Sequence, residues 1–245
     1  MEVHHHPHQG KKKWTDYFWE FFMLFLAVFC GFLAENEREK LVEHHKEKQY
    51  MESLIEDLET DTTELRRAIA KADSVAMYAD SVLMFLASYK VSNSIPIRLS
   101  TIAGLAGQRQ VLINTDRTAS QLKNSGSMRL IRNKKVNNFI LKYWKQIDET
   151  NISLDRYLEY RNSSRELLFK LWIIPDVYQS SQSIKRDSLQ ELKVIDQDPK
   201  KWDEFANLTA ISGNISRNAH SRNLHQQLII ARELIELINR EYHLD

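Results

Sequence analysis

The histidines are the residues of this chain that most directly suggest chemistry, because a neutral imidazole binds transition metals. Six of them fall into two groups: His4, His5, His6, His8, His44 and His45. The N-terminal group lacks a scaffold to fix ligand geometry, since Pro7 disfavours a helix there. In the second group, adjacent side chains on a helix point about 100° apart and cannot easily share an ion. We therefore predict a disordered tail and a solvated helix, with no metal site and no cofactor.

Charged side chains offer acid–base catalysis or phosphate binding. Two clusters are prominent: an acidic run of Glu56, Asp57, Glu59 and Asp61, and a basic set of Arg129, Arg132, Lys134 and Lys135. A solvated helix face explains the acidic run, and the start of a helix in solvent explains the basic set. The formal net charge is +1, from 34 Lys+Arg and 33 Asp+Glu. The whole chain therefore has no general attraction for nucleic acid, and we predict no nucleic-acid partner.

The sequence contains no compact catalytic motif. His-Glu-x-x-His, Cys-x-x-Cys, a glycine-rich phosphate loop and Gly-x-Ser-x-Gly are all missing, and the single cysteine, Cys30, excludes an intramolecular disulfide. Five aromatic residues enrich the predicted long helix that begins near Lys134: Tyr143, Trp144, Tyr157, Tyr160 and Trp172. They suit either a ligand pocket or, more simply, the core of a helical bundle. We predict that the protein is not an enzyme and has no catalytic residues.

An apolar stretch is the most informative feature, because every residue from Phe21 to Ala34 is apolar or glycine. Extended back to Trp14, it makes a helix of about 31 Å, which matches the ~30 Å hydrocarbon core of a bilayer. Nine Phe, Leu and Val residues favour insertion by about 3 to 5 kcal/mol in total, more than Glu20 costs near an interface. An aromatic belt precedes the stretch: Trp14, Tyr17 and Trp19. We predict a transmembrane helix over residues 14–35.

Two alternatives compete with this interpretation. A cleavable signal peptide needs small residues at −1 and −3, but a cut after Ala34 or Gly31 would leave phenylalanine at −3. The helix is therefore expected to be an uncleaved signal-anchor. A buried core helix is the stronger competitor, since about 14 apolar residues suit one. The flanking lysines at 11–13 and the aromatic belt favour the membrane.

Charge asymmetry predicts the orientation. Lys11–Lys13 precede the apolar stretch, whereas residues 35–40 mix three acidic residues with two basic ones. The positive-inside rule then places residues 1–13 in the cytoplasm as a tail and the residues after the helix outside. We expect a bacterial inner (plasma) membrane protein with a periplasmic C-terminal domain.

One face of the predicted transmembrane helix differs from the rest. At about 100° per residue, five residues share a stripe: Glu20, Leu24, Ala27, Gly31 and Ala34. The Ala27-x-x-x-Gly31 spacing allows another helix to approach closely. We predict that this stripe, the transmembrane interaction face, contacts a protein partner or a second copy of the chain. The alternative is a chance spacing in which Glu20 reaches the lipid headgroups.

The remaining residues indicate long helices, since the chain has only 6 Gly and 4 Pro. Residues 36–50 predict a charged helical stalk and residues 51–245 a helical bundle domain outside the cytoplasm. Apolar residues repeat in alternating steps of four and three from Met51 to Leu86, and again within 134–171. The predicted fold class is all-α: an N-terminal transmembrane helix continuing, from about Trp14 to Tyr89, into an antiparallel helical bundle with coiled-coil-like long helices.

Shorter elements are predicted from local signals. Gly104 and Gly107 disfavour a helix over 99–111, and a short helix with its own capping residue is expected between Thr115 and Gly126. Asp198-Pro199 begins a helix that Gly213 should stop, before a final helix. Pro175 is expected to end the long helix that begins near Lys134.

Two stretches resemble a known family. Residues 4–35 read His-His-His-Pro-His, then Lys-Lys-Lys-Trp, then Tyr-Phe-Trp-Glu-Phe-Phe-Met-Leu-Phe-Leu-Ala-Val-Phe-Cys-Gly-Phe-Leu-Ala-Glu, and residues 121–134 read Gln-Leu-Lys-Asn-Ser-Gly-Ser-Met-Arg-Leu-Ile-Arg-Asn-Lys. Both are similar to signatures of a family of small, uncharacterised bacterial single-span membrane proteins with a His-rich and Lys-Lys-Lys tail before the membrane. The resemblance implies the topology and carries no activity with it.

The sequence therefore predicts a membrane-anchored structural or interaction protein whose partners are the lipid bilayer and another protein. The alternative is a helical module outside the cytoplasm that binds a small ligand and acts through a partner. A cavity with converging polar groups would favour ligand binding, whereas a tightly packed core with an exposed apolar strip would favour assembly.

Overall fold

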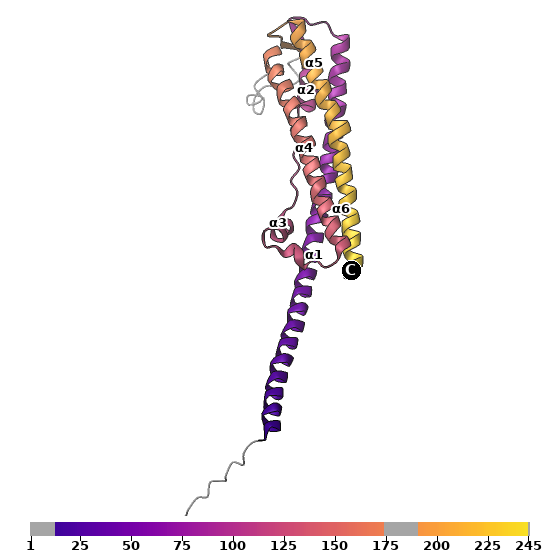
Figure 1. Cartoon of the computed structure of the whole chain (residues 1–245). Coiled ribbons are helices and arrows are strands. Elements are labelled where there is room, and N and C mark those ends of the chain that lie inside the picture. Colours follow the sequence, from indigo (N-terminus) through magenta and orange to yellow (C-terminus); the bar gives the residue numbers. More distant parts are fainter. Residues whose placement is uncertain (1–12, 174–190, 245) are drawn as a thin grey trace, which may run out of the picture. The chain divides into compact units, whose positions relative to one another are not determined.

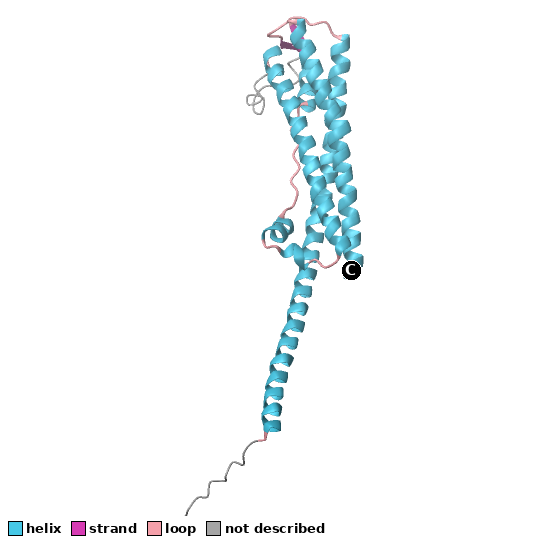
Figure 2. Ribbon diagram, in the orientation of Figure 1, coloured by secondary structure: helices cyan, strands magenta, loops and turns pink. Residues whose placement is uncertain are grey.

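Helices make up most of the chain in the computed structural model, which describes residues 13–173 and 191–244 (Figure 1). The predicted all-α class is confirmed. Within the described residues, the only sheet pairs two short antiparallel strands, β1 (Ser94–Pro96) and β2 (Glu191–Lys193) (Figure 2). The N-terminal histidines and Pro175 lie outside the described residues.

The first helix, α1, runs from Trp14 to Ser88, so the predicted continuity is confirmed. Gly31 is the only glycine or proline among its 75 residues, and nothing else in it breaks a helix. Its charged section gains support from i,i+3 ion pairs, Arg38–Glu35 and Lys40–Glu37, both at 2.6 Å. The chain divides into two compact units, Met1–Tyr50 and Met51–Asp245.

Three long helical segments build the second unit. They are the part of α1 from Met51, then α4 (Lys134–Leu171), and then an unbroken run of α5 (Pro199–Asn214), the π-helix η3 (Ile215–His220) and α6 (Ser221–Tyr242). The start and end of α4 agree with the prediction. Its first turn is capped by Asn133, whose side chain accepts hydrogen bonds from the backbone N–H groups of Lys135 and Val136.

The first two long segments run parallel. Tyr143 of α4 contacts Asp61 of α1, and fourteen residues further along both helices Tyr157 packs with Val75. Parallel neighbours need a connection that returns to the starting end, and residues 89–133 provide it. This connection carries α2 (Ile97–Ala106), α3 (Arg117–Asn124) and the 3₁₀ turn η1 (Ser127–Leu130).

The third segment runs antiparallel to α4. Thr209, near its start, bonds Ser164 near the end of α4, whereas Glu241 near its end bonds Asn133 at the beginning of α4. The antiparallel arrangement therefore holds between this segment and its neighbours, whereas α1 and α4 are parallel to each other.

The predicted apolar seams form the core. Along α1 the buried apolar seam positions are Met51, Leu58, Leu65, Ala72, Ala76 and Ala79. A large apolar cluster lies where α1 and α4 end and α5 begins, around Trp172 stacked on Trp202 with ring centroids 5.6 Å apart. Burial of these apolar surfaces against one another supplies the main stabilisation of the bundle.

Gly213 does not stop a helix, contrary to the prediction. A Cβ added there would lie 2.6 Å from the Cβ of Ala79, so this position needs glycine because α1 passes at close range. The short helix predicted to end at Gly213 therefore continues to Asn214 and, through η3, into α6. Tertiary packing here overrides a local breaker signal.

The interpretation of residues 99–111 was wrong for residues 99–106, although Gly107 does end the helix and residues 108–111 are not helical. A helix, α2, forms across Gly104 and ends at Ala106, with Gly107 as its C-cap. It buries Leu99, Ala103 and Ala106 on one side, and this packing outweighs the roughly 1 kcal/mol that a mid-helix glycine costs.

Candidate functional site

Two carboxylates on α1 hold the connection in place. The backbone N–H of Thr118 donates to Asp57 Oδ2 at 2.9 Å, and that of Thr115 donates to Asp61 Oδ1 at 2.7 Å. Thr118 is the second residue of α3, and its N–H has no partner within the helix. Asp57 of α1 therefore caps the N-terminus of α3, as an N-cap side chain of α3 itself usually does. Asp116, the residue before α3, makes no such bond, and the predicted local cap was wrong.

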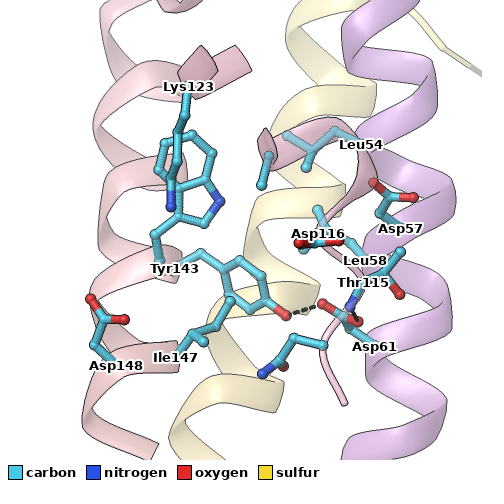
Figure 3. Close-up of a pocket in the computed structure, with 13 residues that line it drawn as sticks. Leu54, Asp57, Leu58, Asp61, Thr115, Asp116, Lys123, Tyr143, Ile147 and Asp148 are labelled. Carbon is cyan, nitrogen blue, oxygen red and sulfur yellow. Dashed lines mark hydrogen bonds between the residues drawn. The ribbon is translucent and has the colours of Figure 1, made fainter. Parts of the chain in front are cut away.

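Asp61 also connects α1 to α4. Tyr143 donates its hydroxyl proton to Asp61 Oδ2 at 2.6 Å (Figure 3). On the other side, the amide of Gln227 in α6 donates to Asn114 at 2.6 Å and reaches the hydroxyl of Tyr143 at 3.4 Å. One polar network thus joins the three long segments to the connection.

Burial sets the electrostatics of this network. Asp61 is 2 % exposed and Asp57 is 3 % exposed. Burial raises the pKa of Asp61, while the hydrogen bonds from Tyr143 and Thr115 lower it again. The pKa of Tyr143 is raised, first by burial and then by the adjacent carboxylate, so the phenol stays protonated and remains a donor.

The solvated-face interpretation was therefore wrong for Asp57 and Asp61, although Glu56 and Glu59 are exposed as predicted. The spacing itself contained a signal. Asp61 lies three residues after Leu58 and four before Leu65, on the same side of the helix as these buried leucines. A carboxylate in such a seam position indicates a buried partner rather than solvent.

A cavity of about 120 Å³ lies beside the network. α1, α3 with the residues before it, and α4 supply its walls (Figure 3). Asp57, Asp61 and Tyr143 belong to its lining, and Lys123 of α3 places its Nζ 4.2 Å from the ring centroid of Trp144 in α4. The predicted aromatic set therefore divides: Tyr143 and Trp144 line the cavity, whereas Trp172 belongs to the core.

The predicted transmembrane interaction face lies on α1. Glu20, Leu24, Ala27, Gly31 and Ala34 are all exposed on the single chain. The opposite side carries a ladder of stacked rings, Phe21–Phe25 at 6.5 Å and Phe25–Phe29 at 5.9 Å between centroids. Large aromatics on one side and small residues on the other distinguish two faces of this helix. That the small-residue face contacts a partner stays a prediction.

The other sequence candidates are not brought together into a site. Within the described residues, no group of three or more His, Cys, Asp or Glu side chains is placed to hold a metal ion. His44 Nδ1 lies 3.7 Å from Glu47 Oε2, one turn further along α1. The four basic residues near the start of α4 are exposed.

No protein-family model, curated protein or solved structure matches the chain. The resemblance to the family of single-span membrane proteins therefore stays a prediction.

Proposed function

We propose that this protein is a membrane-anchored interaction protein without catalytic activity. Its apolar helix would lie in the bacterial inner membrane, with residues 1–13 in the cytoplasm and the helical bundle in the periplasm. The bundle and the transmembrane interaction face would engage a protein partner or a second copy of the chain.

The observation that carries the proposal is an apolar stretch of α1 whose side chains are exposed among the described residues. Among the described residues, α1 is the one helix long and apolar enough to cross a membrane. Its best 18-residue window has a mean hydropathy of 1.9, and none of that window is buried. A core helix would hide such side chains against its own domain, so this stretch needs another apolar environment.

The ring ladder supports the same proposal. By helix geometry Phe25 and Phe29 lie on the side of α1 away from Gly31, and aromatic and aliphatic side chains suit lipid acyl chains. The opposite stripe offers a close approach for a second helix, where Glu20 would be shielded from lipid.

Fusing a reporter enzyme after Asp245 tests the membrane topology. A reporter that is active only outside the cytoplasm should be active on the full chain, because the lysines at 11–13 hold the N-terminus inside. Activity should disappear when residues 14–35 are deleted, since the bundle would then stay in the cytoplasm. A cytoplasm-specific reporter that is active at the same position would contradict the orientation.

Gly31→Leu tests the interaction face. We expect chemical crosslinking in native membranes to yield at least several-fold less of the crosslinked species, because a leucine side chain separates closely packed helices. Phe29→Leu is the matched control, since it changes the opposite face. Equal crosslinking by the two variants and the unaltered chain would refute the interface.

A further inference from the structure

The cavity beside Asp61 has an uneven charge balance. Its lining contains four carboxylates and one ammonium group, namely Asp57, Asp61, Asp116, Asp148 and Lys123. Asp57 has a cationic partner, because Arg117 Nη2 lies 2.9 Å from its Oδ1. Asp61 has none: across residues 13–173 and 191–244, no Lys or Arg forms an ion pair with it, and the charge that acts on it is that of Asp57.

A buried carboxylate usually has a cation nearby, since an unpaired buried charge is costly. Asp61 accepts hydrogen bonds from the Tyr143 hydroxyl and from the backbone N–H of Thr115, and the Thr115 side chain is a third donor. A carboxylate has about four lone-pair positions, so about one remains for a further donor. A positively charged hydrogen-bond donor in the cavity would fill that position and balance the charge.

The other lining residues indicate the size and polarity of the rest of such a ligand. Leu54, Leu58, Ala119, Ile147 and the ring of Trp144 make most of the lining apolar. An apolar cavity of about 150 Å³ holds benzene, so 120 Å³ accommodates about five non-hydrogen atoms. A divalent metal ion needs several oxygen ligands around it, and among the described residues the lining carboxylates are not grouped closely enough to hold one. An anion is opposed by the carboxylates.

We propose that this cavity binds a short-chain primary amine, with its ammonium group at Asp61 and its alkyl chain between Trp144 and the leucines of α1. Lys123 already presents a primary ammonium group to the face of Trp144, 4.2 Å from the ring centroid. The Lys123 side chain therefore occupies the wall on which the alkyl chain of the ligand would pack, and the two compete for it. Binding here is independent of membrane anchoring, because every lining residue belongs to the second unit.

Titration with n-butylammonium chloride, followed by ¹⁹F NMR on the full chain in nonionic detergent, tests the proposal. Labelling with 5-fluorotryptophan gives five signals, one per tryptophan, and Trp144→Phe identifies the relevant one. That signal should shift saturably, with a dissociation constant on the order of 1 mM for so small a ligand. Sodium butyrate at equal ionic strength should leave it unchanged. Equal or non-saturating shifts with the two salts would overturn the proposal.

Variants locate the ammonium group. Asp61→Asn should weaken n-butylammonium binding by about 10-fold or more, as expected for losing a charge-assisted hydrogen bond. Asp155→Asn, on an exposed site of α4 outside the cavity, is the matched control and should bind unchanged. Lys123→Met should strengthen binding by about two- to five-fold, because it removes from the cavity lining the one positive charge, which repels the ammonium group of the ligand. If Asp61→Asn does not fold, the Lys123→Met result decides, and no gain in affinity refutes the site.

Discussion

Replacing Trp172 with alanine should lower the free energy of unfolding by about 3 to 5 kcal/mol. The indole is fully buried. It stacks on Trp202 at 5.6 Å, meets Phe205 edge-on at 5.5 Å, and donates its Nε1–H to Ser100 Oγ at 3.1 Å. The substitution leaves a cavity in the apolar cluster around Trp172 and Trp202 and removes aromatic contacts worth about 0.5 to 1.5 kcal/mol beyond burial.

Chemical denaturation of the full chain in nonionic detergent measures this loss. Met84→Ala is the control, because the Met84 side chain is 74 % exposed on α1 and should change the free energy of unfolding by less than about 0.5 kcal/mol. Ser100→Ala separates the hydrogen bond from the packing and should cost about 1 kcal/mol. A Trp172→Ala variant that unfolds at the same denaturant concentration as Met84→Ala would show that this cluster does not determine stability.

Helix bounds could be predicted from the sequence wherever interactions between neighbouring residues determine them. The bounds of α4 follow from its heptad pattern and from Asn133, whose cap is a local interaction. The continuity of α1 follows from the lack of breakers over 75 residues. The start of α5 follows from Asp198 and Pro199. Asp198 is the N-cap and accepts a hydrogen bond from the N–H of Lys200, and Pro199 is the first residue of the helix.

Where partners distant in the sequence decide, local patterns failed. The hydrogen bonds that Asp57 accepts from Thr118 and that Asp61 accepts from Tyr143 span 61 and 82 residues. A local sequence pattern is too short to include both the donor and the acceptor. Gly213 allows α5 to pack closely against Ala79 of α1. The parallel course of α1 and α4 was equally hidden, because a heptad seam packs against a neighbour of either direction.

The free energy of unfolding should fall as the pH decreases, because the bundle buries a histidine at the end of its π-helix. His220 is 1 % exposed, and its Nδ1 lies 3.1 Å from Ser153 Oγ. That hydroxyl donates to the carbonyl of Thr150 at 2.7 Å. From this network we assign the imidazole proton to Nδ1, which then donates to Ser153 Oγ. Burial lowers the pKa of His220 to about 4 from its ordinary value of 6.5.

The sign of the effect follows from proton linkage. Between pH 6.5 and 4 the unfolded chain binds a proton at this histidine and the folded chain does not, so the free energy of unfolding falls as pH decreases. The stabilisation is fully present above pH 6.5, and a shift of this size corresponds to a loss of about 3 kcal/mol as pH approaches 4. The raised pKa of Asp61 acts in the opposite direction at the acidic end, since the folded chain takes up a proton there more readily.

His220→Gln isolates the histidine contribution. The variant is expected to be less stable than the unaltered chain at pH 7.5, because glutamine does not reproduce the imidazole packing, but its stability should decline less between pH 7 and 4.5. The difference between the two slopes, measured by denaturation in the same detergent, should equal about one proton near pH 5.5. Parallel pH profiles for the two chains would mean that His220 titrates normally and is not held neutral by the bundle.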